Sequence, residues 1–208
     1  MINILYIAYQ FPPLNVGGSA RPARFVKYLR KYGVHTTVVT LASESLPNVS
    51  PNAKNDSNLF DNHHKDFDVL EVPSKYKIDR NKNKIINFIE IFFSKYKGNE
   101  QAIIVTAPPF SILPLAVATS KKHNIPLIVD MRDHWTLWVM APYSSYFNYM
   151  ASKLAENSVF KHAKKIITTS KVTQEDFIKF HPNVNPEKFK YIPNGFEELI
   201  TYKDIIFT

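Results

Sequence analysis

Short apolar runs alternate with longer amphipathic segments along almost the whole chain, and this alternation constrains the fold more than any other feature. The apolar runs are rich in Ile and Val and are bounded by Pro, Gly, Asn or a charged residue, as strands are. Strands that alternate with helices are typical of a parallel sheet whose two faces are covered by helices, with right-handed crossovers. The sequence therefore predicts an α/β, Rossmann-like fold with a mostly parallel sheet of about seven strands.

The expected elements follow from this alternation. Strands are predicted at residues 2–9, 34–40, 67–72, 101–106, 125–130, 164–169 and 188–192. Helices are predicted at residues 19–32, 82–97, 109–123, 143–163 and 171–180. Gly33 is placed to end the first helix in a left-handed conformation. Residues 41–66 are rich in Ser, Asn, Asp and Pro without periodicity, so we expect a long, mobile surface loop there.

Composition limits the classes of protein that need to be considered. A length of 208 residues favours one domain with a substantial core. Cysteine is absent, which excludes a disulfide framework and thiolate chemistry. No apolar stretch is long enough to span a bilayer, and the first strand lacks the features of a signal peptide, so a cytoplasmic protein is expected. The net charge of +8 implies an anionic partner: nucleic acid, a phosphorylated ligand or an anionic membrane.

The first candidate site is the glycine loop that follows the first strand. Gly17 and Gly18 would let the backbone approach a ligand at the carboxyl edge of the sheet, beside the N-terminus of a helix. Arg21 and Arg24 share one face of the first helical turns, where a cation opposes the helix dipole, and an anionic ligand would explain them. The alternatives are glycines that only turn the chain and arginines that are only solvated.

The second candidate follows the strand predicted at 101–106. Thr106 and Ser111 would supply hydroxyl groups to a ligand at the same edge of the sheet. The two prolines between them, Pro108 and Pro109, can begin a helix, whose first turn needs no N–H partner. A simple strand-to-helix connection is at least as good an explanation.

The third candidate is the cluster of residues 130–138, at the carboxyl end of another predicted strand. Arg132 and Trp135 could bind and stack on a sugar, and Asp133 or His134 could orient or deprotonate a hydroxyl group. The alternative is an ion pair between Arg132 and an aspartate, with the tryptophans in the core. The position of the 130–138 cluster at the edge of the sheet favours a binding site over this alternative.

A metal site is not expected. The nearest approach to a ligand cluster consists of Asp61, His63, His64 and Asp66. These residues lie in the polar 41–66 stretch, and no further residues have a spacing typical of metal ligands.

Four segments in order resemble the N-terminal domain of family 4 retaining glycosyltransferases. They are Phe-Pro-Pro-Leu-Asn-Val-Gly-Gly-Ser-Ala-Arg (11–21), Thr-Ala-Pro-Pro-Phe-Ser (106–111), Asp-Met-Arg-Asp-His-Trp (130–135) and Ile-Pro-Asn-Gly-Phe (192–196). The resemblance covers residues 1–197 and implies one half of a GT-B fold, the half that mainly holds the acceptor. It also implies that Asn194 and Gly195 take part in substrate binding.

The resemblance further implies the chemistry. The family transfers sugars from nucleotide-diphosphate donors, without a further cofactor, to glycan or polyprenyl-linked acceptors in surface polysaccharide synthesis. Substitution takes place on the front face of the anomeric carbon, and backbone amides such as those at Gly17 and Gly18 stabilise the departing diphosphate. Many members place a histidine at this edge, and either Asp133 or His134 would occupy that place here.

The chain departs from the family at its C-terminal end. In the family a second domain holds the donor through a Glu-x7-Glu motif, and the expected domain division here is 1–197 followed by a tail or linker at 198–208. The C-terminal donor-binding domain is expected to be absent, and the isolated chain is expected to be inactive. The first alternative is a sugar- or anion-binding module without catalysis. The second is a nucleic-acid-binding protein, which no recognised motif supports.

A basic stretch of the sequence bears on where in the cell the protein is expected. Residues 75–97 contain seven basic and two acidic residues around the apolar run 85–93. Burial of this run in the core is the default, whereas a helix lying in a membrane interface would suit a lipid-linked acceptor. The sharper expectation is peripheral contact with an anionic membrane, such as the inner face of the plasma membrane. The aromatic residues that could extend that surface are Tyr143, Tyr146, Phe147 and Tyr149.

Overall fold

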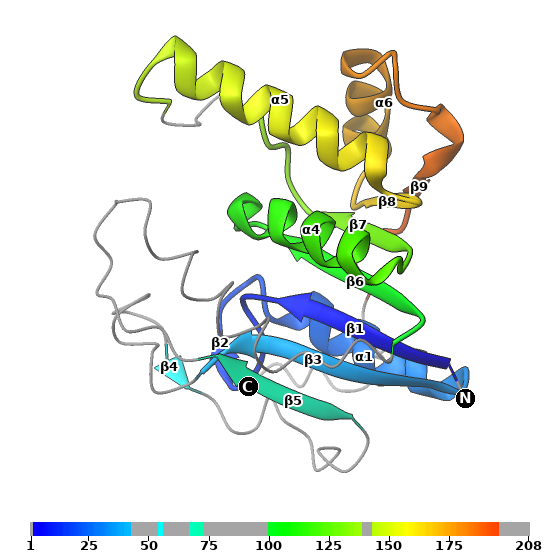
Figure 1. Ribbon diagram of the computed structural model, residues 1–208. Helices are drawn as coiled ribbons and strands as arrows, with labels where there is room; N and C mark the ends of the chain where they lie inside the picture. Colours follow the sequence, from blue (N-terminus) through cyan, green and yellow to red (C-terminus); the bar gives the residue numbers. More distant parts are fainter. Residues whose placement is uncertain (1, 43–53, 56–66, 73–99, 139–142, 196–208) are drawn as a thin grey trace, which may run out of the picture.

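The computed structural model describes residues 2–42, 54–55, 67–72, 100–138 and 143–195 (Figure 1). Its centre is a seven-stranded sheet in the order β5-β3-β1-β6-β7-β8-β9, and every neighbouring pair is parallel. The strands are β1 (Ile2–Ala8), β3 (Val34–Leu41), β5 (Asp68–Val72), β6 (Ala102–Ala107), β7 (Leu127–Met131), β8 (Lys165–Thr168) and β9 (Phe189–Tyr191). The predicted Rossmann-like sheet of about seven strands is confirmed.

The described helices cover the two faces of this sheet. They are α1 (Ala20–Lys31), α4 (Leu113–His123), α5 (Tyr146–His162) and α6 (Lys171–Phe180), with short 3-10 turns η4 (Phe110–Ile112) and η5 (Pro186–Lys188). Ser145 and Ser170 begin α5 and α6 as N-caps, because each hydroxyl accepts a hydrogen bond from the backbone N–H three residues later. The helix predicted at 82–97 lies outside the described residues.

The alternation of side chains along β1 explains why both faces need a cover. Ile4, Tyr6 and Ala8 pack with Val26 of α1 in one apolar cluster. Leu5 and Ile7 point to the opposite face, where the side chains of α4, α5 and α6 form the larger cluster. Since successive residues of a strand point to opposite faces, an unbroken apolar run is stable only when it is buried on both.

Two helices are followed by a residue whose backbone is in the left-handed conformation. Gly33 has a φ of +75°, and its N–H donates to the carbonyl of Arg30, so the predicted end of α1 is confirmed. Asn124 ends α4 in the same way, with a φ of 53°. Asparagine tolerates this conformation better than other residues with a side chain, yet the sequence pattern had not singled it out.

A short antiparallel pair was not predicted. β2 (Leu14–Asn15) lies in the glycine loop and pairs with β4 (Lys54–Asn55). β4 falls within the stretch expected to be one long loop, and residues 43–53 and 56–66 lie outside the described part of the chain. Within the part that is described, no helix is long and apolar enough to cross a membrane.

Candidate functional site

Parallel pairing brings the candidate segments to one edge of the sheet. β6 lies between β1 and β7, so the loops after these three strands are neighbours at their carboxyl ends. A direct link is the backbone N–H of Arg132, which donates to the carbonyl of Ala107 at 3.1 Å. The topology therefore places the glycine loop, the 106–111 segment and the 130–138 cluster beside one another, where open α/β sheets bind ligands.

Arg21 and Asp130 form a buried ion pair behind this edge. The Nη2 atom of Arg21 lies 2.8 Å from Oδ1 of Asp130, and the two side chains are 7% and 0% exposed. The Nε atom donates to the same carboxylate, and the hydroxyl of Thr106 donates to its Oδ2 at 2.9 Å. The anion opposite Arg21 in this structure is thus a protein carboxylate, and Thr106 is buried behind it.

The remaining N–H groups of Arg21 hold the segment after β9. They donate to the carbonyls of Ile192 and Pro193 and to the Oδ1 of Asn194. Because a guanidinium has five N–H groups, Arg21 has an acceptor for each of them. Arg24 continues the contact by donating to the carbonyl of Gly195 at 3.0 Å. Both arginines therefore join α1 to the 192–195 segment, and their part in substrate binding stays a prediction.

The backbone of Gly18 is packed closely against the side chains of Gln10 and Arg132. A Cβ atom at this position would lie 1.7 Å from Oε1 of Gln10 and 2.4 Å from Nη1 of Arg132. At Gly17 nothing lies within 4 Å of the corresponding position. A side chain at Gly18 would have to displace the ends of the Gln10 and Arg132 side chains, whereas one at Gly17 would displace nothing.

Arg132 crosses the edge from β7 toward the glycine loop. Its Nε donates to the carbonyl of Ala107, and its Nη2 donates to the carbonyl of Pro108 at 2.6 Å and to Oε1 of Gln10 at 3.4 Å. Burial lowers the pKa of this guanidinium, and the charge of nearby Asp130 acts in the opposite direction. The ion pair considered between Arg132 and an aspartate is not formed with Asp130, which binds Arg21. Arg132 therefore presents a cation, held by neutral oxygens, next to Gly18.

His134 is held by a carboxylate that the sequence reading missed. Its Nε2 lies 3.0 Å from Oδ2 of Asp176 on α6, and its ring packs edge-on against Phe177. An ionised carboxylate only accepts hydrogen bonds, so Nε2 is the nitrogen that donates, and in the neutral ring Nδ1 is the acceptor. Asp133 is exposed. Of the two residues proposed for the catalytic place, His134 is the one with a fixed orientation.

Trp135 stacks on Phe110. The ring centroids are 5.4 Å apart and the rings are nearly parallel, at 4°. Tyr143 donates a hydrogen bond to the carbonyl of Trp135. Ser111 follows Phe110 in η4 and is partly buried. Trp135 therefore packs against the segment that contains Ser111, whereas Trp138 is 52% exposed.

A second carboxylate that could not be identified from the sequence binds the 130–138 cluster, at Thr136. Glu156 on α5 is fully buried, and it accepts hydrogen bonds from the hydroxyl and the backbone N–H of Thr136. His181, which is 3% exposed, lies 3.5 Å from the same carboxylate. A single acid in an amphipathic helix gives no sign of its partner in the sequence, and only the fold brings these residues together.

Metal ligation finds no support in the described part of the chain, which contains no cluster of three or more His, Cys, Asp or Glu residues. The group considered from the sequence, around His63 and His64, lies outside the described residues. The basic stretch 75–97 lies outside them as well, so its expected contact with a membrane stays a prediction.

Comparison with known proteins gives one family and one fold. The sequence model of Glycosyltransferase Family 4 matches residues 17–198. No curated protein sequence matches the chain significantly. Among solved structures, sucrose-phosphate synthase from Thermosynechococcus elongatus is similar with a TM-score of 0.62 at 15% identity, over 94% of this chain and 49% of that one.

Two further structures show how widely this fold is shared. Anabaena HepE, solved in complex with UDP and glucose, gives a TM-score of 0.54 at 16% identity, over 94% of this chain and 45% of that chain. A UDP-N-acetylglucosamine 2-epimerase gives 0.53 at 13% identity, over 90% of this chain and 47% of that chain. The chain thus spans about half the length of these proteins and has the fold of one GT-B half.

Proposed function

This chain belongs to glycosyltransferase family 4, and on that premise we propose that it forms the acceptor-side half of an enzyme that transfers a sugar from a nucleotide-diphosphate donor. The acceptor would be a glycan or a lipid-linked sugar used in surface polysaccharide synthesis. In the transfer, the bond from the anomeric carbon to the diphosphate breaks and a bond to the acceptor oxygen forms on the same face. The proton of the acceptor hydroxyl passes to the departing phosphate oxygen.

The observation that carries this proposal is the packing of Gly18 beneath Gln10 and Arg132. The first amides of a helix have no acceptor within the helix, and the helix dipole favours a negative charge at that end. Arg132 adds a positive charge within reach of the same place, because its Nη1 lies 2.4 Å from where a Cβ atom of Gly18 would be. These donors are in place before the reaction, so they would stabilise charge as it develops on the diphosphate.

His134 would bind the acceptor on the other side of the edge. With Nε2 bound to Asp176, its Nδ1 would accept a hydrogen bond from the acceptor hydroxyl group. This contact would orient the hydroxyl oxygen toward the anomeric carbon, and an oriented nucleophile lowers the entropic part of the barrier. The stacked rings of Trp135 and Phe110 would form an apolar wall beside a sugar ring.

The proposal is tested by a transfer assay with the enzyme that contains this chain. A panel of radiolabelled nucleotide-diphosphate sugars is incubated with glycan and lipid-linked acceptors, and both the labelled product and the released nucleotide are measured. Transfer that requires an acceptor supports the proposal. Binding of sugars without turnover under all conditions favours the non-catalytic binding module instead, and interconversion of free nucleotide sugars contradicts a transferase.

A further inference from the structure

The first turns of α5 carry an apolar surface that nothing in the proposed chemistry uses. Phe147 and Leu154 are 84% and 65% exposed, and Tyr146 beside them is 72% exposed. Phe147, Ala151 and Leu154 share one face of the helix, and the buried residues of α5 lie on the opposite face. Isolated apolar residues at a surface are ordinary, but several on one helical face need an explanation.

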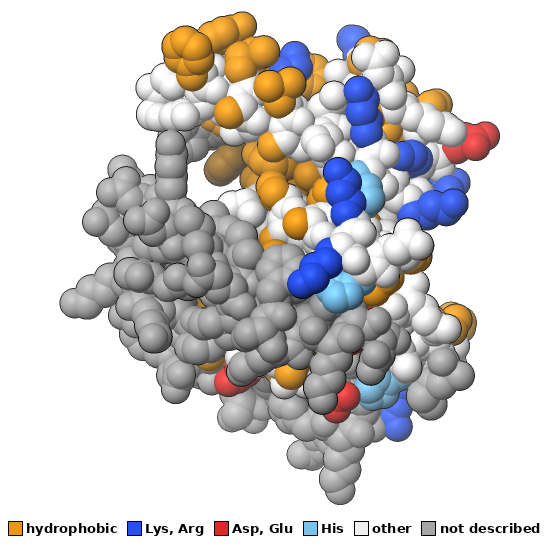
Figure 2. All heavy atoms as spheres, viewed as in Figure 1, with side chains coloured by type: hydrophobic (Ala, Val, Ile, Leu, Met, Phe, Trp, Pro, Cys, Tyr) orange, Lys and Arg blue, Asp and Glu red, His pale blue; other side chains and the backbone are white. Residues whose placement is uncertain are grey.

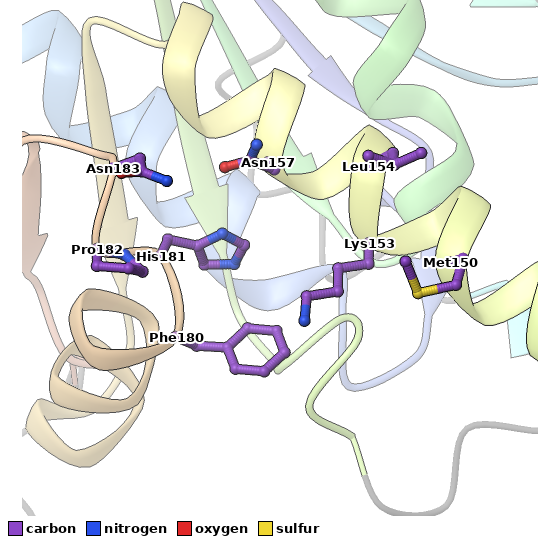
Figure 3. A pocket seen from close by; sticks show the side chains of 8 residues that line it. All are labelled: Met150, Lys153, Leu154, Asn157, Phe180, His181, Pro182 and Asn183. Atoms are coloured by element: carbon purple, nitrogen blue, oxygen red, sulfur yellow. The ribbon is translucent and has the colours of Figure 1, made fainter.

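An apolar hollow extends this face toward α6. It has a volume of about 210 Å³, lies between α5 and the C-terminal end of α6, and is lined in part by Met150, Leu154, Phe180 and Pro182 (Figure 3). Lys153 stands at its rim, with its Nζ 4.4 Å from the centre of the Phe180 ring. Met150 and Leu154 belong both to the hollow and to the exposed helical face, and the polar residues that line the hollow are Lys153, Asn157, His181 and Asn183. We call this helical face the α5 face, meaning Tyr146, Phe147, Met150, Ala151 and Leu154.

The composition around the α5 face identifies the chemistry of its partner. Tyr143, Tyr146 and Tyr149 are clustered, with ring centroids 5.4 and 6.4 Å apart, and tyrosine is enriched where an apolar phase meets water. The one acidic residue of α5 is Glu156, which is fully buried against Thr136. The surface near the C-terminal end of α5, away from Tyr146 and Phe147, is basic. Its exposed lysines are at 121, 122, 161 and 164. Figure 2 shows the apolar side chains gathered at one end of α5, with Lys and Arg side chains beyond them.

We infer that the α5 face binds the surface of an anionic membrane, with its aromatic and aliphatic side chains inserted between lipid headgroups. Apolar insertion and attraction between lysines and anionic lipids reinforce each other in this kind of binding. The same charge argues against a second copy as the partner, because the chain carries a net charge of +8 and two copies would repel each other. The inference does not depend on the proposed transfer reaction.

The test is co-sedimentation of the 208-residue chain with lipid vesicles. One set of vesicles is pure phosphatidylcholine, and the other also contains phosphatidylglycerol as the anionic lipid. The test variant is Phe147→Ser with Leu154→Ser, which leaves the net charge unchanged. The control is Tyr32→Ser with Val172→Ser, which removes one residue just after α1 and one on α6, 83% and 66% exposed. Thermal unfolding by circular dichroism checks that all the proteins fold.

We expect wild type and control to bind the anionic vesicles, and the test variant to lose about tenfold or more of its partition coefficient. Binding to pure phosphatidylcholine should be weaker than to the anionic vesicles for every protein. Equal binding by wild type and the test variant, or no binding by wild type, overturns the inference. Concentration-dependent dimerisation that the test variant abolishes, measured by analytical ultracentrifugation without vesicle binding, would also overturn it and assign the face to a second copy.

Discussion

Arg21 and Asp130 lie 109 positions apart in the sequence, yet their side chains form one buried ion pair, with Nη2 and Oδ1 separated by 2.8 Å. The pair joins the start of α1 to the end of β7, and Arg21 also holds the carbonyls of Ile192 and Pro193. Three segments that contribute to the carboxyl edge are therefore bound by a single guanidinium. This arrangement makes Arg21 a positioning residue for the proposed site.

Replacing Arg21 by methionine should reduce the free energy of unfolding by about 3–5 kcal/mol, because the buried Asp130 carboxylate then loses its cation. Urea denaturation of the chain measures this change. Adding Asp130→Asn to Arg21→Met should recover part of the loss, because Thr106 can still donate to the neutral side chain. A double variant that is as unstable as the sum of both single variants would contradict the coupling.

The sheet could be predicted because each strand carries its own local signal. β1 and β6 are apolar on both faces, and their bounds follow from that pattern within one or two residues. The β2–β4 pair has two residues on each side, too few for a periodicity to be seen. The left-handed end of α4 at Asn124 was missed because an asparagine is also common in ordinary turns.

His134 should contribute to turnover more than Asp133 does. His134→Gln is expected to lower kcat by about tenfold or more, because the acceptor hydroxyl loses the nitrogen that orients it. Asp133→Asn, at an exposed neighbouring position, is the matched control and should keep turnover near that of wild type. The assay is initial-rate transfer by the enzyme at saturating donor. A larger loss of kcat in Asp133→Asn than in His134→Gln would place Asp133 at the catalytic position.

Asp176→Asn tests the orientation of His134 directly. The substitution preserves size but removes the charge that fixes the proton on Nε2, so kcat should fall while KM for the donor stays near its wild-type value. Asp176→Glu should restore part of the activity. A rise in donor KM without a change in kcat would indicate that this pair binds the donor instead.

The place of the candidate site at the carboxyl edge of the sheet could be predicted from the sequence. The hydrogen-bond partners of its residues could be predicted less well. The three segments could be assigned to one edge because the carboxyl ends of parallel strands coincide. Asp176 and Glu156 could not be found, because each meets its partner only through packing between elements distant in sequence. The anion opposite Arg21 was expected to belong to a ligand, since the sequence offers no way to choose Asp130 over its neighbours.

Stability should depend on pH through His162. Burial and the charges of Lys121 and Lys188 lower the pKa of this histidine in the folded protein from its ordinary value of 6.5. The unfolded chain then binds the proton more tightly, so the contribution to stability is fully present above about pH 6.5 and is lost as the pH falls through the lower folded-state pKa. Urea midpoints across this range should fall less steeply for His162→Gln than for wild type. Identical slopes would contradict the assignment.

The central claim is that the edge formed by Gly18 and Arg132 is where sugar transfer takes place, and one substitution tests it most directly. The three atoms nearest to a Cβ added at Gly18 belong to the ends of the Gln10 and Arg132 side chains, which can move aside, so Gly18→Val should fold with nearly wild-type thermal stability. The displaced Arg132 would no longer stabilise the departing diphosphate, so the rate of transfer by the enzyme should fall by about a hundredfold or more. Gly17→Ala, where nothing lies within 4 Å of the added atom, should keep the wild-type rate. A Gly18→Val enzyme that transfers sugar as fast as wild type would contradict the account.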